Sequence, residues 1–94
     1  DAKDFLVLDV RTPGEFRRGY IEGAVLMNYY DPDFRERFAA LDRSLTILTY
    51  CHVGSRSSDV LALADALGFQ RVFDLRGGIV AWKGEGLPLA GAGP

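Results

Sequence analysis

Cys51 is the only cysteine in the chain, and its neighbours favour a reactive thiol. Residues 46–50 predict a buried strand, and residues 58–67 predict an amphipathic helix. Between them lies a tight loop with the sequence Cys51-His52-Val53-Gly54-Ser55-Arg56-Ser57. At a helix N-terminus the backbone N–H groups lack intrahelical partners, and the helix dipole adds about half a positive charge. Such a loop stabilises an anion, so the pattern predicts that Cys51 is a thiolate nucleophile.

The nucleophile interpretation depends on this setting, because a lone cysteine is more often a small buried hydrophobic residue. We expect the loop amides, the helix dipole and Arg56 to lower the pKa of Cys51 below the free value of about 8.5. No general base is then required, and the same amides can hold an anionic group attached to the sulfur. A sulfur that is out of solvent and faces the interior would contradict the interpretation.

The other loop residues have a structural and a functional interpretation. Arg56 either binds an anionic donor or braces the loop through carbonyl contacts, and Ser57 is a candidate N-cap. His52, the only histidine, either tunes Cys51 and contacts substrate or is simply exposed, and nothing beside it indicates a metal site. Gly54 supplies a turn conformation. Val53 and Ser55 complete the set of predicted substrate-contacting loop residues.

Three charged residues at strand ends are predicted to support this loop. Asp9 lies in an apolar strand, where a carboxylate is costly to bury unless it is paired, so we expect a salt bridge or loop-bracing hydrogen bonds. Arg11 follows that strand, and a structural role is favoured over contact with the donor. Arg76 follows another strand and carries the same two interpretations.

The surrounding pattern alternates short apolar strands with helices. Strands are expected at 5–10, 24–27, 46–50 and 71–75. Helices are expected from Pro13 to Gly19, from about Asp33 to Leu41, over 58–67 with Gly68 as the C-terminal cap, and over 79–83. Thr12, Pro13 and Glu15 form a capping-box pattern at the first helix.

This alternation predicts the fold class, a small single α/β domain with a central, mostly parallel β-sheet flanked by helices on both faces. Ligands of such sheets bind beyond the carboxyl ends of the strands. Arg11, Cys51 and Arg76 all follow strand ends, so we expect them at one rim. The domain is expected to cover residues 1–90, with a flexible tail at 91–94.

Composition narrows the function classes. The chain has 94 residues and a net charge of −2, without the clustered excess of Lys and Arg typical of nucleic-acid binding. No apolar run approaches the roughly 20 residues that cross a bilayer. A single cysteine cannot form an internal disulfide, which favours the cytoplasm over the periplasm. The chain does not begin with Met, so an excised domain is expected and targeting is not settled.

The ordered set of motifs resembles the rhodanese family of single-domain sulfurtransferases. The matching segments are Asp9-Val10-Arg11-Thr12-Pro13 with Glu15-Phe16, Gly19-Tyr20-Ile21-Glu22-Gly23-Ala24, Asn28, Tyr50-Cys51, Gly54-Ser55-Arg56-Ser57 and Gly77-Gly78-Ile79-Val80-Ala81-Trp82. The resemblance implies a Cys51 persulfide that passes a sulfane sulfur from a small donor such as thiosulfate to cyanide or a thiol, including a protein thiol. It implies no cofactor and no metal.

Two departures from the family pattern stand out. Tyr20 occupies the position of the family's usual His, so any packing role of that His falls to a Tyr. Family members also carry a further strand and helix before the segment that begins at Phe5. Either a sheet strand is missing here, or the sheet is completed differently.

The sequence pattern is compatible with two other functions. Phosphatases and arsenate reductases share the fold, but their loop is one residue longer than the four residues, His52 to Ser55, that separate Cys51 from Arg56. The shorter loop suits one sulfur atom better than a tetrahedral oxyanion. The remaining alternative is a non-catalytic sulfur-relay or regulatory rhodanese module within a larger protein.

Overall fold

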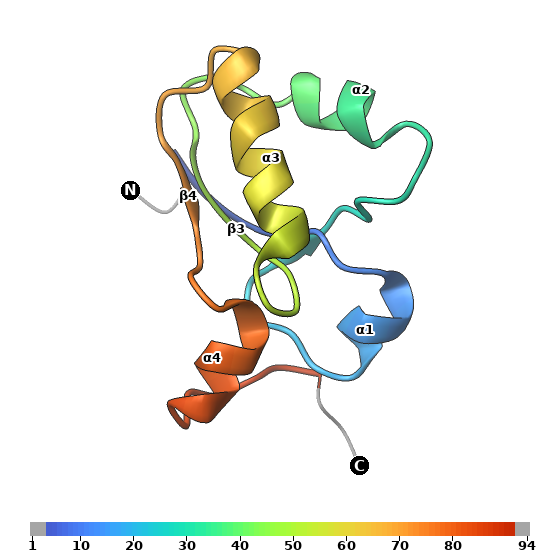
Figure 1. Ribbon diagram of the computed structural model, residues 1–94, viewed down its shortest axis with the longest axis vertical. Helices are drawn as coiled ribbons and strands as arrows, with labels where there is room; N and C mark the ends of the chain where they lie inside the picture. Colours follow the sequence, from blue (N-terminus) through green and yellow to red (C-terminus); the bar gives the residue numbers. More distant parts are fainter. Residues whose placement is uncertain (1–3, 92–94) are drawn as a thin grey trace.

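The computed structural model describes residues 4–91, and within them a four-stranded, wholly parallel sheet forms the centre of the molecule (Figure 1). The strand order is β2-β1-β3-β4. The strands are β1 (Phe5–Asp9), β2 (Val25–Leu26), β3 (Thr46–Tyr50) and β4 (Val72–Asp74). All three pairings are parallel, which confirms the predicted α/β fold class. Of the expected tail at 91–94, all but Gly91 lies outside the described residues.

Four helices connect and follow these strands, namely α1 (Pro13–Arg17), α2 (Phe34–Ala39), α3 (Ser55–Ala66) and α4 (Gly78–Gly84). Most lie where the sequence predicts them. The exception is α3, which begins at Ser55 instead of at residue 58. The predicted N-cap at Ser57 is therefore wrong, since Gly54 occupies that position with a φ of 115°. A positive φ of this size is readily available only to glycine, and it lets the loop enter the helix early.

The two faces of the sheet bury two separate apolar clusters. On β1, Val7 packs into one cluster and Leu8 into the other, because successive strand residues point to opposite faces. The larger cluster takes its helical residues from α2 and α3, including Phe38 and Val60. The smaller one combines Tyr50 with Ile21 and Ile79. Helices on both faces were predicted, and the clusters confirm them.

The capping box predicted at α1 is present. The Glu15 backbone N–H donates to Thr12 Oγ1 at 3.3 Å, and the Thr12 N–H donates to Glu15 Oε1 at 3.1 Å. Pro13 follows as the first helical residue, where its missing N–H costs nothing. These contacts fix the direction in which the chain leaves β1.

The carboxyl ends of the parallel strands meet at one rim, where the loop between β3 and α3 lies between α1 and α4 (Figure 1). After α4 the chain returns toward α1, and Ala90 forms an isolated antiparallel β-bridge with Tyr20. The Tyr20 N–H donates to the Ala90 carbonyl at 3.0 Å, and the Ala90 N–H donates to the Tyr20 carbonyl at 2.7 Å. The Tyr20 ring also stacks on Phe16, with ring centroids 4.0 Å apart. In this protein Tyr20 therefore joins α1 to the segment after α4.

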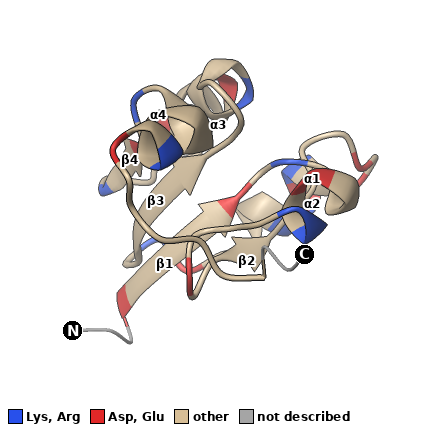
Figure 2. Ribbon diagram, turned by 90° about the horizontal axis from the view of Figure 1, so that it is seen from below, with Lys and Arg blue, Asp and Glu red and all other residues tan. Residues whose placement is uncertain are grey.

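Lys and Arg positions are interspersed with Asp and Glu positions along the ribbon of the described residues (Figure 2). Among residues 4–91, no helix has both the length and the hydropathy needed to cross a membrane.

Candidate functional site

The Cys51 sulfur is held by the loop that follows it. The Gly54 backbone N–H donates to Cys51 Sγ at 3.1 Å, and the Ser57 hydroxyl lies 3.6 Å from the same atom. The early start of α3 places Ser57 on the inner side of its first turn, where the hydroxyl also lies 3.3 Å from the Gly54 carbonyl. Ser57 thus contacts the sulfur instead of capping the helix.

Cys51 has no exposed surface, and it belongs to the larger apolar cluster. The nucleophile interpretation requires a reachable sulfur, and in this conformation the sulfur is covered. Its hydrogen bonds nevertheless come from the loop, so Sγ faces polar donors and not only apolar side chains. The sulfur is therefore out of solvent, and it lies between the larger apolar cluster and the polar donors of Gly54 and Ser57.

The electrostatics of the loop favour the thiolate. Burial raises the pKa of Cys51, because a charged sulfur loses hydration. The backbone and hydroxyl of Ser57 and the amides of Gly54 and Arg56 lower that pKa by more. The net result is a pKa below the ordinary value of a thiol, as the sequence predicts.

The Arg56 side chain pairs with Glu15 and does not lie free at the loop. Arg56 Nη1 donates to Glu15 Oε1 at 2.7 Å, and Nη2 donates to Oε2 at 2.9 Å. The guanidinium also lies 5.7 Å from the ring centroid of Tyr30. Hydrogen bonding to Arg56 is the main cause that lowers the pKa of Glu15 to about 2. The bracing contact of Arg56 is therefore a carboxylate on α1, not the expected loop carbonyls.

Asp9 and Arg11 form the salt bridge that the sequence predicts. Arg11 Nη2 donates to Asp9 Oδ2 at 2.7 Å and to the Gly19 carbonyl at 2.7 Å, while Nε donates to Asp9 Oδ1 at 3.0 Å. Both residues are buried. This geometry uses Arg11 to hold the β1–α1 turn against the start of the segment after α1.

The N-terminus of α4 fixes the outer side of the cysteine loop. The Ile79 N–H donates to the Cys51 carbonyl at 2.9 Å, and the Val80 N–H donates to the His52 carbonyl at 3.1 Å. Gly78 allows this approach, since a Cβ atom there would lie 2.6 Å from the Cys51 carbonyl oxygen. The Gly77-Gly78 pair therefore sets the position of the loop as well as making a turn.

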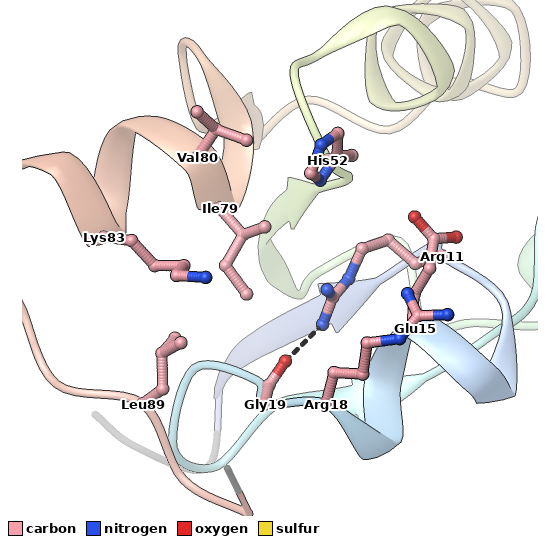
Figure 3. A pocket seen from close by; sticks show the side chains of 9 residues that line it. All are labelled: Arg11, Glu15, Arg18, Gly19, His52, Ile79, Val80, Lys83 and Leu89. Atoms are coloured by element: carbon pink, nitrogen blue, oxygen red, sulfur yellow. Dashed lines mark hydrogen bonds between the residues drawn. The ribbon is translucent and has the colours of Figure 1, made fainter.

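A cavity of about 310 Å³ opens beside the loop, between α1 and α4 (Figure 3). Its polar lining comes from Arg11, Glu15, Arg18, His52 and Lys83, together with the backbone of Gly19. Its apolar lining comes from Ile79, Val80 and Leu89. His52 is exposed and faces this cavity from the loop.

Arg76 does not line this cavity and belongs to a second pocket. It lines a shallow depression with Val53, Gly54 and Gly77, next to the exposed ring of Phe73 on β4. Arg11 and Arg76 therefore line two different pockets, the first with His52 of the loop and the second with Val53 and Gly54. Ser55 is exposed at the first position of α3.

Sequence reasoning assigned Glu15 to helix capping and missed its contact with Arg56. It also missed Arg18 and Lys83 as cavity residues. A carboxylate that caps one helix gives no signal of a partner 41 positions away. Among residues 4–91, no group of three or more His, Cys, Asp or Glu side chains has the arrangement of a metal site.

The chain is similar to proteins of one family. Residues 1–85 match the family model described as a rhodanese-like domain. A sulfurtransferase from Allochromatium vinosum is 38% identical over 89 residues, which cover 95% of this chain and 81% of that relative. A rhodanese-related protein from Thermoplasma volcanium has a similar structure, with a TM-score of 0.84, 31% identity, and coverage of 96% of this chain and 87% of that one.

Some relatives are much longer. The probable adenylyltransferase/sulfurtransferase MoeZ from Mycobacterium tuberculosis is 37% identical over 87 residues, covering 93% of this chain but only 22% of that protein. Other similar proteins carry the names thiosulfate sulfurtransferase and tRNA uridine(34) hydroxylase.

Proposed function

This chain belongs to the rhodanese-like domain family, and on that basis we propose that it is a sulfurtransferase that carries a sulfane sulfur as a persulfide on Cys51. The observation that carries the proposal is the setting of the Cys51 sulfur. It accepts a hydrogen bond from the Gly54 amide, lies beside the Ser57 hydroxyl and has a lowered pKa. A thiolate at neutral pH is the attacking species that sulfur transfer needs.

In the first half-reaction, the Cys51 thiolate attacks the outer sulfur of a donor such as thiosulfate. An Sγ–S bond forms, the S–S bond of the donor breaks, and sulfite leaves with the electron pair of that bond. The persulfide that remains carries one negative charge on its terminal sulfur. The amides around the loop are positioned to stabilise this charge, as they stabilise the thiolate.

In the second half-reaction, a nucleophilic acceptor attacks the terminal sulfur. Cyanide gives thiocyanate, and a thiolate gives a new persulfide. In both cases the Sγ–S bond breaks and Cys51 leaves as the thiolate, ready for another cycle. No cofactor enters either step. Because Cys51 has no exposed surface, both steps require the groups around the sulfur to open locally.

The supporting residues have positioning roles in this proposal. Glu15 and Arg56 tie α1 to the first turn of α3, and Asp9 with Arg11 fixes the β1–α1 turn. With both guanidinium groups held by carboxylates, the loop amides supply most of the stabilisation of the sulfur anion. His52 and Val53 of the loop are proposed to contact donor or acceptor, together with Arg76, which lines a pocket with Val53.

The alternative function is a sulfur-relay or regulatory module within a larger protein. The small share of MoeZ that this chain covers supports this alternative. Steady-state turnover distinguishes the two functions. Multiple turnovers with thiosulfate and cyanide, absent in Cys51→Ser, support the enzyme. Handover of a single sulfur equivalent per Cys51, without turnover on either small substrate, supports the relay. Failure to take up sulfur from several sulfane donors would contradict the enzyme and leave the relay or an inactive regulatory module as the better account.

A further inference from the structure

The outer edge of β4 carries main-chain groups that no neighbouring strand uses among residues 4–91. β4 is the last strand in the order β2-β1-β3-β4, and α3 packs beside it (Figure 1). β3 bonds to the Arg71 carbonyl and to the Leu75 amide, and the bonding groups of a strand alternate in direction. The N–H and C=O groups of Val72 and Asp74 therefore point away from β3. They can pair with an added strand.

Apolar side chains are exposed along this edge and continue onto the cysteine loop. Phe73 on β4 is 58% exposed, Val53 in the loop is 56% exposed and Leu61 on α3 is 37% exposed. All three line the shallow depression that also contains Arg76. Exposed apolar residues that gather in one place are typical of a binding surface, whereas scattered ones are not. We call this surface the β4 depression, and its residues include Val53, Gly54, Leu61, Phe73, Asp74 and Arg76.

Asp74 supplies an acceptor that the described chain leaves without a donor. Its Oδ1 atom is buried and forms no hydrogen bond within residues 4–91. Neither Asp74 nor Arg76 forms an ion pair in that part of the chain. A charge on a short edge strand also prevents aggregation, which is a sufficient reason for a solvated carboxylate. It does not explain a buried oxygen without a partner, and such an oxygen favours an incoming donor.

The β4 depression shares a residue with the setting of the sulfur. The Gly54 N–H donates to Cys51 Sγ at 3.1 Å, and Gly54 also lines the depression. β4 is parallel to β3, so both strands end at the rim where the cysteine loop lies. A segment that pairs with β4 and continues past Asp74 therefore meets Val53 and Gly54 of that loop.

The occupant that fits this surface is an extended segment of another protein. A second copy is disfavoured, because antiparallel pairing with Phe73 opposite its mate places Asp74 diagonal to the same carboxylate of that copy. A nucleic acid is disfavoured, because the charge of Arg76 is balanced by that of Asp74. A small ligand would leave the main-chain groups of the edge unused. Main-chain pairing, with alternate side chains in pockets, is the way in which sheet edges bind peptides.

We propose that the β4 depression docks an extended segment of an acceptor protein, which carries a thiol and, a few residues away, a basic side chain that faces Asp74. This inference rests on the proposed sulfur transfer. Apolar side chains of the segment contact Leu61 and Phe73, and its main chain pairs with β4. Its thiolate attacks the terminal sulfur of the Cys51 persulfide. An S–S bond forms on the acceptor, and the Sγ–S bond breaks so that Cys51 leaves as the thiolate.

A synthetic peptide that reads the same in both directions tests the docking. Acetyl-Val-Lys-Val-Gly-Cys-Gly-Val-Lys-Val-amide can pair in either direction and still bring its thiol to the rim. Its second-order rate constant for sulfur uptake from the persulfide form should exceed that of N-acetylcysteine methylamide about tenfold, as expected for one or two net hydrogen bonds. The same peptide N-methylated at every Val and Lys keeps its side chains and should lose this advantage. Equal rate constants for all three thiols would overturn the inference.

Phe73→Ser should lower the rate constant of the peptide about three- to tenfold, because apolar contact is lost, and should leave turnover with cyanide unchanged. Val25→Ser is the matched control, since Val25 is 50% exposed on β2 at the opposite edge of the sheet. It should change neither rate. An equal loss with cyanide in Phe73→Ser would show a structural role and overturn the inference, as would the same loss for the peptide in Val25→Ser.

The role of Asp74 is tested with a second peptide in which Glu replaces both Lys residues. The wild type should prefer the Lys peptide by about three- to fivefold, the range expected for one solvent-accessible charge pair. Asp74→Asn should lose this preference. A wild type that shows no preference, or a preference that persists in Asp74→Asn, would contradict the contact with the basic side chain.

Binding of a serine form of the peptide separates failure of docking from failure of sulfur transfer. Acetyl-Val-Lys-Val-Gly-Ser-Gly-Val-Lys-Val-amide cannot accept sulfur, and it should slow hydrogen exchange at the Val72 and Asp74 amides of the thiol form. This protection without persulfide formation would reject only the proposed function. Persulfide formation without this protection would reject only the docking surface. Exchange that is already slow in the protein alone would also reject the surface, because the edge would then be covered.

Discussion

Arg56 and Glu15 form a bidentate ion pair that joins the first turn of α3 to α1, with N–O distances of 2.7 and 2.9 Å. Glu15 also accepts a hydrogen bond from the Thr12 amide through its capping box. One carboxylate therefore couples the turn after β1 to the loop after β3. Of the two roles expected for Arg56, this relationship favours bracing, through a carboxylate instead of loop carbonyls, and it has a pH signature.

Glu15→Gln should destabilise the protein by about 1–2 kcal/mol at pH 7, because it removes a partly buried bidentate ion pair while keeping a residue that completes a capping box. In the folded state the pKa of Glu15 is lowered from 4.5 to about 2. The stabilisation is therefore fully present above pH 4.5 and is lost as the pH falls toward 2. Urea unfolding of both proteins should give a stability difference that shrinks over this window. A difference that is independent of pH would contradict the ion pair.

Ser57→Ala should raise the pKa of Cys51, because the Ser57 hydroxyl lies 3.6 Å from Sγ and helps to lower that pKa. The rate of alkylation by iodoacetamide, measured against pH, should shift to higher pH and fall several-fold at pH 7. Ser58→Ala is the matched control, since Ser58 is exposed on the next position of α3. Identical profiles for all three proteins would show that the hydroxyl does not act on the sulfur.

Asp9→Asn should destabilise the protein by about 3–5 kcal/mol, because it leaves the buried guanidinium of Arg11 without its carboxylate. Replacing both partners in Asp9→Leu/Arg11→Met should cost less than the single change, since no buried charge then remains unpaired. Denaturant midpoints of the two variants decide this. A double variant that is less stable than Asp9→Asn would contradict the view that the unpaired charge of Arg11 causes the loss of stability.

Gly78→Ala should lower sulfur-transfer activity strongly and destabilise the fold by about 1–3 kcal/mol. The added Cβ meets the Cys51 and His52 carbonyls, and a φ of 61° is strained for alanine. Gly84→Ala in the same helix is the control, because nothing lies within 4 Å of its Cβ position and its φ is not positive. It should be neutral in thermal melts and in turnover. Equal behaviour of the two variants would remove the proposed constraint of α4 on the loop.

The parallel sheet and the rim were predictable because their signals are local. Apolar runs such as 46–50 specify strands, and the Thr12–Glu15 pattern specifies a helix start within four residues. The Asp9–Arg11 pair was also predictable, because a carboxylate in an apolar strand needs a partner and Arg11 lies two residues away. These features follow from the residue types and from their spacing over short stretches of the chain.

The contacts that complete the site join segments far apart in the chain. Glu15 and Arg56 are 41 positions apart, and the α4 amides reach the cysteine loop from 28 positions away. No local pattern encodes such pairs. The earlier start of α3 was also missed, because Ser55 to Ser57 resemble a polar loop while the φ of Gly54 alone permits the helix to begin there. That shift converts Ser57 from a cap into a partner of the sulfur.

The central claim is that Cys51 carries a transferable sulfur, and intact-mass analysis after incubation with thiosulfate tests it most directly. The account predicts that the wild type gains the mass of one sulfur atom, loses it on addition of cyanide, and that Cys51→Ser gains nothing. A wild-type mass that stays unchanged with several sulfane donors, or the same gain in Cys51→Ser, would contradict it.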